Sequence, residues 1–354
     1  MLPVGEKQIL TSGSSLQAFL CFFWPLKLML SHNLGWAVIR DFFLPSFMVG
    51  KRYIKRLKQA INKDIKCWSN LEYQFGQHLS RLGKVGSAVH PIMEELDIIN
   101  DDLRENLSKY IEEQDKNAIF PPDARGKMIQ DFIKPEQYLR DFEMTEIQNL
   151  KESVGRQRGN TVKIMTYNYT NTIERLLVKC PVSFDTYEIE EPIHVHGYYN
   201  NRMILGVNDE SQINNDILKT DPDALITLVK SRNNATYGIQ HTRKCEEWIK
   251  NGNLICCYGL SFGETDKMWW EMIGAELKRR TNLKIILFHF DEQQIDYSNN
   301  GAKYQRKVNQ EKRKFIKKCN LTDESEIERI ESSIYVVVNS NIFNTHIIET
   351  EHIA

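Results

Sequence analysis

The sequence predicts an α/β protein with a mainly parallel sheet and a largely helical N-terminal portion. From residue 51 to about residue 155, apolar side chains recur at three- and four-residue steps, which is the period of amphipathic helices. From residue 156 onwards, short β-branched segments alternate with helical patterns. That alternation is typical of parallel strands that are connected by helices on both faces of a sheet.

The helical portion contains three predicted helices. The first covers residues 51–79, the second begins at Pro91, where proline suits the first turn, and the third runs over residues 127–153. Glu72 occupies a step of the apolar stripe of the first helix, so we expect its carboxylate to face inward. A buried acid is either paired with a cation or kept neutral. Glu72 is therefore a candidate catalytic residue, and a structural ion pair is the alternative.

The second portion supplies the strands. They are predicted at residues 162–167, 193–196, 203–207, 254–258, 284–290 and 333–338. Helical patterns at residues 171–178, 213–230, 266–279 and 303–330 separate most of them. Ligands of parallel sheets bind beyond the carboxyl ends of the strands, so residues directly after each strand are the candidates for chemistry. The expected organisation is an apolar segment over residues 1–50, a helical region over 51–155 and an α/β domain over 156–354, the last two being compatible with one domain.

Composition narrows the class of protein. The 354 residues include 46 Lys or Arg and 47 Asp or Glu, a balance that argues against a wholly basic nucleic-acid binder. Residues 1–50 hold only five charged side chains, but Pro25 and Lys27 interrupt their most apolar run, at residues 16–30. A spanning helix needs about 18 unbroken apolar residues. We therefore expect a buried or irregular apolar segment and no membrane span, with a membrane-associated N-terminus as the alternative.

The seven cysteines indicate the redox environment. Their number is odd and no Cys-x-x-Cys pair occurs, so neither a disulfide framework nor a zinc module is predicted. Cys256 and Cys257 lie inside an apolar run and are expected to pack as small hydrophobic residues. This usage favours a reducing, cytoplasmic location.

Polar residues follow the first predicted strand of the second portion. Asn168 comes directly after it, with the hydroxyls of Thr166 and Thr170 on either side. Such a cluster is typical of a ligand site at a strand end. The alternative is a simple helix cap, in which Thr170 or Asn171 accepts hydrogen bonds from the free N–H groups of the next helix.

A His-x-His pair follows at the next strand. His194 and His196 would point the same way from a strand, which suits a metal, but no third ligand is evident and no metal site is predicted. His196 followed by Gly197 instead suits a general base, because glycine lets a substrate approach the backbone.

A Gly-x-Ser-x-Gly turn follows residues 254–258. Gly259 and Ser261 could hold a hydroxyl, a ribose or a phosphate at the start of the next helix. A capped turn with Asp266 near the helix N-terminus is the plain structural alternative. The same pattern is that of a nucleophile elbow, and Asp291 and His346 follow in the order that a serine hydrolase requires. A serine hydrolase with Ser261 as nucleophile is thus an alternative function.

Residues 303–318 form a basic stretch. They contain eight Lys or Arg and one acid, Glu311. Such a stretch could contact nucleic-acid phosphates, although a solvated helix face is the more common structure. It supports a third, non-enzymatic alternative, a toxin or sensor module that binds a phage or nucleic-acid partner.

Several of these motifs together resemble a known family. The segments, in order, are residues 68–72 (WSNLE), 168–174 (NYTNTIE), 194–197 (HVHG), 204–207 (ILGV) and 258–266 (YGLSFGETD). Over about residues 60–292 the chain resembles the AbiH family of bacterial abortive-infection proteins, which implies a role in phage defence against an unknown trigger. The strand and Gly-Asn-Gly-Phe-Asp loop that usually open this family have no match in residues 1–50.

The same order of motifs is similar, more distantly, to the Rossmann-like (sirtuin-like) NAD-binding fold. This resemblance implies that Asn168 positions a ribose or the attacking water and that His196 is the general base. Ser261 and Gly259 would bind the nucleotide, and Thr166, Gly197 and Asp266 complete the expected binding set. NAD would be the substrate or ligand, and its hydrolysis would deprive an infected cell of it. Thr170 stands where sirtuins usually carry an aspartate, so deacylase activity is not implied.

Overall fold

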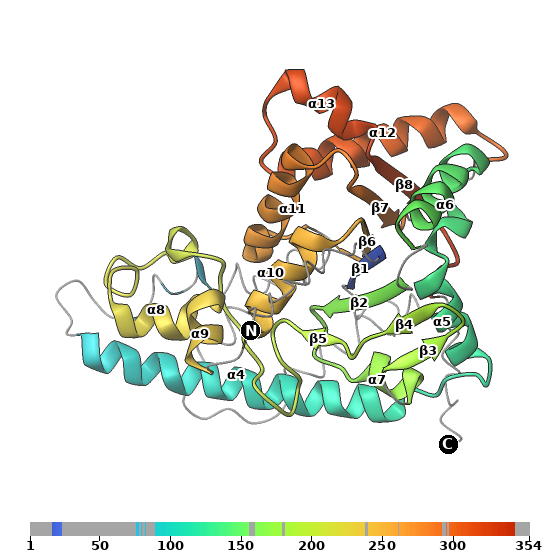
Figure 1. Cartoon of the computed structure of the whole chain (residues 1–354). Coiled ribbons are helices and arrows are strands. Elements are labelled where there is room, and N and C mark those ends of the chain that lie inside the picture. The colour runs from blue at the N-terminus through green and yellow to red at the C-terminus, as the bar shows by residue number, and fades with distance from the viewer. Residues whose placement is uncertain are drawn as a thin grey trace, which may run out of the picture.

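The computed structural model describes residues 16–22, 76–77, 79, 82, 89–155, 160–178, 181–237, 240–260, 262–291, 295 and 297–343, with only the backbone described for 16–22, 89, 110, 114, 117 and 155. Its strands form one sheet in the order β3-β4-β2-β1-β6-β7-β8, and β5 pairs with β2 (Figure 1). All the pairs are parallel except the β3–β4 hairpin. The strands are β1 Leu16–Phe22, β2 Asn160–Thr166, β3 Val182–Phe184, β4 Tyr187–Ile189, β5 Ile193–His194, β6 Leu254–Tyr258, β7 Lys284–His289 and β8 Ile334–Val338. The predicted α/β architecture with a mainly parallel sheet is confirmed.

Helices cover both faces of the sheet. One face packs against α5 (Ala124–Ile133), α6 (Asp141–Gly155) and α7 (Thr172–Leu177), and the other against α10 (His241–Asn251), α11 (Lys267–Arg279) and α12 (Gly301–Lys318). Neighbouring residues of a strand point to opposite faces, so Cys256 joins the first core and Cys257 the second. Both thiols are buried as predicted, and buried Cys245 and Cys319 are likewise unbonded.

The central strand β1 comes from the charge-poor segment. It pairs with β2 on one side and β6 on the other, so that Leu20 is the register partner of both Ile164 and Cys256. The sequence did not predict this strand. From β1 the chain first builds the β2 side of the sheet and then returns to build the β6 side, so the direction of winding reverses between β1 and β6. In open α/β sheets, ligands bind at such a reversal, beyond the carboxyl ends of the strands.

A third apolar cluster lies beside the sheet. The long helix α4 (Val89–Asn117) carries the predicted stripe, of which Ile92, Leu96, Ile99, Leu103 and Leu107 are buried. This stripe packs against residues 203–229, including α8 (Pro222–Leu228), and Figure 1 shows α8 and α9 (Lys230–Thr236) beside one end of α4. None of the described helices is long and apolar enough to cross a membrane.

Five predicted elements differ from the structure. The helical pattern at 303–330 is two helices, α12 and α13 (Glu324–Glu331). Residues 203–207 are not a strand, because they pack on α4 and contribute only an isolated bridge between Val207 and Val229. The predicted strand 193–196 ends at His194, and His196 lies in the following turn. The helical pattern at 213–230 is divided into a turn, α8 and α9, since Pro222 starts a new helix. The predicted helix 127–153 is α5, the 3₁₀ helix η4 (Pro135–Tyr138) and α6.

The remaining helical elements are short or lie near the C-terminus. They are the 3₁₀ helices η5 (Glu210–Gln212) and η6 (Glu264–Asp266) and the α-helix α13 (Glu324–Glu331). Most of the first predicted helix, residues 51–79, lies outside the described residues, and so does Glu72.

Candidate functional site

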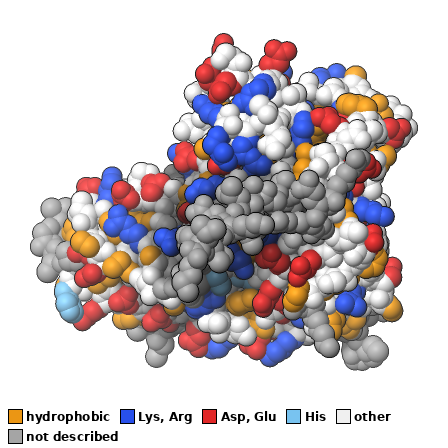
Figure 2. Space-filling view, in the orientation of Figure 1, with side chains coloured by type: hydrophobic (Ala, Val, Ile, Leu, Met, Phe, Trp, Pro, Cys, Tyr) orange, Lys and Arg blue, Asp and Glu red, His pale blue; other side chains and the backbone are white. Residues whose placement is uncertain are grey.

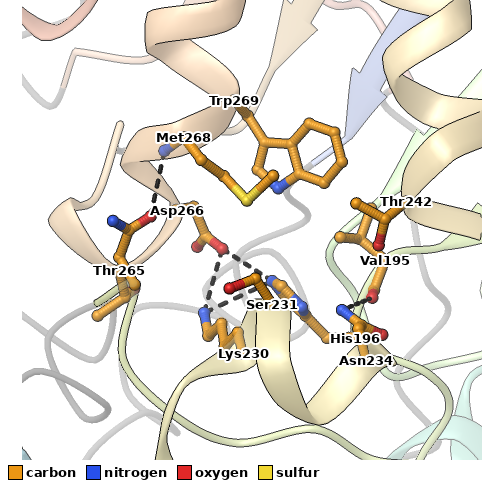
Figure 3. Close-up of a pocket in the computed structure, with 11 residues that line it drawn as sticks. Val195, His196, Lys230, Ser231, Asn234, Thr242, Thr265, Asp266, Met268 and Trp269 are labelled. Atoms are coloured by element: carbon orange, nitrogen blue, oxygen red, sulfur yellow. Dashed lines mark hydrogen bonds and ion pairs between the residues drawn. The ribbon is translucent and has the colours of Figure 1, made fainter. Parts of the chain in front are cut away.

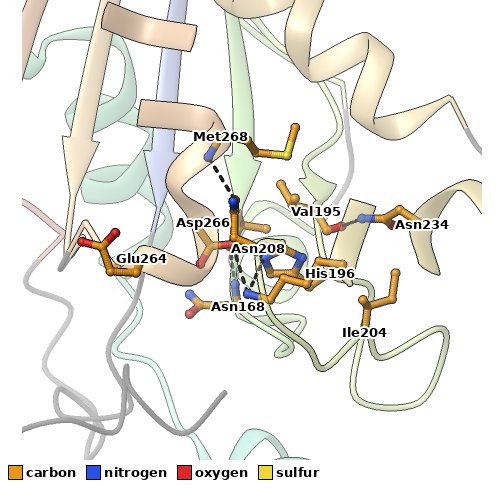
Figure 4. Close-up of polar contacts among 12 residues, drawn as sticks. Asn168, Val195, His196, Ile204, Asn208, Asn234, Glu264, Asp266 and Met268 are labelled. Atoms are coloured by element: carbon orange, nitrogen blue, oxygen red, sulfur yellow. Dashed lines mark hydrogen bonds and ion pairs between the residues drawn. The ribbon is translucent and has the colours of Figure 1, made fainter. Parts of the chain in front are cut away.

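Three predicted site residues lie beyond the carboxyl ends of β2, β5 and β6. In the parallel register Thr166 pairs with His194, so Asn168 and His196 each lie two residues past a paired position. Asp266 arrives from η6, which follows β6. Figure 4 shows Asn168, His196 and Asp266 at this edge of the sheet. The order of strands therefore assembles side chains that are up to 98 residues apart in the chain.

His196 and Asp266 form a buried pair. The His196 Nε2 lies 2.8 Å from the Asp266 Oδ1. The Lys230 Nζ lies 3.1 Å from the same oxygen and 3.5 Å from the same ring nitrogen (Figure 3). The three residues expose only 5%, 8% and 5% of their surface, for His196, Asp266 and Lys230 respectively. A buried charge must be paired, and here one carboxylate serves both neighbours.

The location of Asp266 decides between its two sequence interpretations. It is the N-cap residue of α11, but its side chain makes no capping hydrogen bond. Burial by itself would raise the pKa of this carboxyl, and the charges and hydrogen bonds of Lys230 and His196 outweigh burial and lower the pKa. Asp266 is therefore an ionised partner of His196 and not a helix cap.

An ionised Asp266 fixes the tautomer of His196. A carboxylate only accepts hydrogen bonds, so the ring proton sits on Nε2 and donates to Asp266. In the neutral ring the lone pair is then on Nδ1, which is buried and has no hydrogen-bond partner among the described residues. His196, Asp266 and Lys230 line a small pocket, together with Asn208, Thr265 and Trp269 among others. The ring of His196 is thus oriented through one nitrogen, and the other has no described partner.

The Asn168 backbone is held on both sides. The Asn168 N–H donates to the Thr166 Oγ1 at 3.1 Å, and the His194 Nδ1–H donates to the Asn168 carbonyl oxygen at 2.7 Å. Thr166 is fully buried, so its hydroxyl serves to position Asn168. The alternative of a helix cap by Thr170 or Asn171 is not what the structure shows. Asn171 is the N-cap residue of α7 but makes no side-chain capping bond, and Thr170 accepts from the Thr172 hydroxyl at 3.0 Å.

Two glycines of the predicted set have positive φ angles. Gly197 has a φ of 76°, and a Cβ built on it would lie 2.0 Å from the Arg202 carbonyl oxygen. The backbone of Arg202 therefore occupies the space where a side chain at position 197 would lie. Gly259, directly after β6, has a φ of 66°. Both positions are in the left-handed region that favours glycine.

The structure describes the other predicted sites only in part. Ser261 and His346 lie outside the described residues, so the triad of a serine hydrolase stays a prediction. Asp291, its third member, forms an ion pair with Lys307 at 2.9 Å. His194 and His196 contact different partners, and no group of three or more His, Cys, Asp or Glu that could hold a metal occurs in the described part of the chain.

The sequence analysis missed three polar residues that fix the turn around Asp266. Besides Lys230, one is Asn208, whose Oδ1 accepts from the Met268 N–H at 3.1 Å (Figure 4). The other is Gln212, whose Nε2 donates to the Glu264 carbonyl at 3.0 Å. No pattern marked them, since a lysine and two amides on loops and helix ends usually indicate solvent exposure.

The basic stretch on α12 is partly neutralised by its own neighbours. Lys307 and Lys314 pair with buried Glu311 at 3.1 and 3.6 Å, and Lys318 pairs with Glu264. Figure 2 shows acidic and basic side chains interleaved over α11, α12 and α13. These contacts agree with a solvated helix face, and nucleic-acid binding by residues 303–318 stays a prediction.

Comparison with known proteins places this fold and site in a family. No curated protein matches the chain. A model of the family described as "Bacteriophage abortive infection AbiH" matches residues 31–289, a span that includes β2, β5, β6 and every residue of the His196 cluster. This match covers well over half of the 354 residues. The chain therefore belongs to the AbiH family of bacteriophage abortive infection proteins.

Proposed function

We propose that this protein acts in abortive infection by hydrolysing the N-glycosidic bond of NAD or a related nucleotide, on a Rossmann-like, sirtuin-like sheet. The strand order supports the scaffold. The strands β3, β4 and β5 together occupy one position beside β2, and β2 is followed across the sheet by β1, β6, β7 and β8. Numbered along the chain with that group as strand 3, the order is 3-2-1-4-5-6, which is the order of doubly wound dinucleotide-binding folds. The candidate side chains lie where such folds bind their ligand.

One observation carries the proposal. The His196 imidazole is oriented through Nε2 by an ionised, buried carboxylate, and its Nδ1 has no described partner. A general base needs an oriented ring, a lone pair that is not already used and a nearby position for the proton donor. A structural histidine would be expected to use both nitrogens, as His194 does.

The chemistry follows from this geometry. Water attacks the anomeric carbon of the nicotinamide ribose, and the carbon–nitrogen bond breaks with its electron pair going to the pyridinium nitrogen. Neutral nicotinamide leaves, and His196 Nδ1 takes the proton of the water. Asp266 stabilises the imidazolium that forms, as carboxylates do for catalytic histidines elsewhere. Asn168, whose backbone is fixed from both sides, would orient the ribose or the water.

The test measures NAD in cells during phage infection and in reactions with purified protein. We expect the wild type to release nicotinamide and His196→Ala to lose this activity by at least about 100-fold, the usual contribution of a general base. His90→Ala, at an exposed histidine at the start of α4, is the matched control and should behave as wild type. Unchanged NAD in infected cells that carry the active protein would contradict the proposal.

A further inference from the structure

The backbone of Asn168 is held from both sides, whereas its side chain is not. The N–H donates to the Thr166 hydroxyl at 3.1 Å, and the carbonyl oxygen accepts from the His194 Nδ1–H at 2.7 Å. Asn168 is partly exposed, and none of the described residues makes a hydrogen bond to its side-chain amide. The donors and the acceptor of this amide are therefore available to a ligand, at a position that the backbone contacts fix.

The residue that follows is held by the same segment of the chain, residues 194–204. The Tyr169 carbonyl oxygen accepts from the Tyr199 N–H at 2.9 Å, and the Tyr169 hydroxyl donates to the Ile204 carbonyl oxygen at 2.8 Å. The Ile204 N–H in turn donates to the His196 carbonyl oxygen at 2.9 Å. This segment therefore links the loop after β2 to the backbone of His196, so that the two sides of the proposed site are held in a fixed relation.

The ring of His194 is itself held in place. Its side chain is fully buried, and its Nε2 lies 2.7 Å from the Glu174 Oε1 on α7. The Tyr198 ring lies against it, with 3.9 Å between the ring centroids. Contacts at one nitrogen and on one face restrict the direction in which the ring presents its other nitrogen. Glu174 thus supports the contact between His194 and the Asn168 backbone.

We propose that His194, supported by Glu174, is a positioning residue that fixes the Asn168 side chain for its ligand, the ribose or the attacking water. This inference rests on the proposed function for the identity of that ligand. The physical reason is the cost of misplacement, because a shift of about 1 Å in a group that orients the reacting atoms can cost about 100-fold in rate. His194 contacts only the backbone of Asn168, so it acts on the reaction through that residue.

A double-mutant cycle on nicotinamide release tests this route of action. His194→Leu removes both polar contacts of the ring, and Asn168→Ala removes the amide but keeps the carbonyl that His194 bonds. We expect each change alone to lower kcat by about 10- to 100-fold. The double variant should be no more than about twofold slower than Asn168→Ala, because the amide that His194 positions is then absent. His194→Asn, whose amide keeps a donor near the place of Nδ1, should recover part of the lost rate.

Stability of the same variants separates positioning from a merely structural role. His194→Leu should lower the urea midpoint of unfolding by the same amount with Asn168 and with Asn168→Ala, since the carbonyl is present in both. A loss of kcat that is equally large in both backgrounds would overturn the proposal. Lys151→Met is the control variant, because it breaks a buried pair with Glu136 between α6 and η4, and it should lose stability but keep kcat. If His194→Leu does not fold, Glu174→Ala, which keeps the histidine and removes its support, takes its place in the cycle.

Hydrogen–deuterium exchange distinguishes failure of this inference from failure of the proposed function, because it does not depend on NAD. The backbone amides of residues 166–172 should exchange faster in His194→Leu than in the wild type, since the loop has lost one of its contacts. If exchange becomes faster and the wild type releases no nicotinamide, the positioning of Asn168 holds and NAD hydrolysis is wrong. If nicotinamide is released and exchange does not change, hydrolysis stands and the positioning role of His194 is wrong.

Discussion

Glu174 on α7 and His194 at the end of β5 are joined by a contact of 2.7 Å between Oε1 and Nε2. The other ring nitrogen, Nδ1, donates to the Asn168 carbonyl oxygen at 2.7 Å. Both ring nitrogens of His194 therefore have a partner within hydrogen-bond distance. His194 thus connects α7 to the Asn168 loop through both ring nitrogens, which explains why it does not pair with His196 as a metal ligand.

Replacement of His194 should destabilise the protein. His194→Ala leaves the Glu174 carboxylate and the Asn168 carbonyl without this partner, and we expect a loss of about 2–3 kcal/mol in the free energy of unfolding, measured with urea. His90→Ala removes a histidine that faces Glu94 on an exposed helix surface, and should change stability by less than about 0.5 kcal/mol. Equal effects of the two changes would contradict this role of His194.

Asp266 should make stability depend on pH in the acid range. Its pKa is lowered in the folded state by Lys230 and His196 in spite of burial. The ionised group therefore contributes its full stabilisation above the ordinary pKa of an aspartate, about 3.9, and this contribution is lost as the pH falls below that value. The difference in unfolding free energy between wild type and Asp266→Asn should shrink from pH 5 to pH 2.

Asp115 is a control for this pH dependence, because its pKa is shifted in the opposite direction from that of Asp266. Burial raises its pKa although Arg175 opposes the shift, so the folded state binds its proton more tightly than the unfolded state does. Its contribution to stability falls as the pH rises. Urea unfolding of Asp115→Asn should therefore show the reverse trend, and parallel trends for the two variants would refute the assignment.

Gly197 should not tolerate a side chain. Its φ of 76° and the Arg202 carbonyl oxygen, 2.0 Å from the place of a Cβ, predict a loss of more than about 2 kcal/mol for Gly197→Ala. Gly126→Ala is the control, because this glycine lies within α5 with no atom within 4 Å of its Cβ position. Alanine there should stabilise the protein by about 0.5–1 kcal/mol. Thermal or urea unfolding of both variants measures the contrast.

The serine-hydrolase alternative predicts a different result from the proposed mechanism. A fluorophosphonate reacts with a serine that a histidine activates. If His196 activates water on NAD, Ser261 should remain unlabelled in protein that releases nicotinamide, as detected by mass spectrometry of peptides. Labelling that is lost in Ser261→Ala and in His346→Ala would instead favour the hydrolase.

Local patterns determined most of the second half of the fold. The short apolar runs that form β2, β6, β7 and β8 could be recognised as strands because a strand that is buried on both faces is an almost continuous run of apolar residues. The stripe on α4 was equally clear. Residues 203–207 failed as a strand because a short apolar run also suits an irregular segment that packs on a helix, and periodicity cannot separate the two.

The strand β1 could not be predicted from local sequence patterns. Its run LQAFLCF reads as part of a longer apolar stretch, and only pairing with β2 and β6 defines where the strand begins and ends. A strand is stabilised by partners that are distant in sequence, so its boundaries are decided by the whole sheet. The reversal of winding at β1, which locates the candidate site, follows from that placement alone.

The sequence by itself determined the kinds of side chain at the strand ends: Asn168 after β2, His196 after β5 and Asp266 after β6. Only the tertiary structure decided what they do, because hydrogen bonds and charges act over a few ångströms and the partners are far apart in the chain. Asp266, which the sequence left open as a cap or a ligand contact, became the partner of His196. Lys230, 34 residues from His196 in the chain, entered the site because the start of α9 lies against His196 and Asp266.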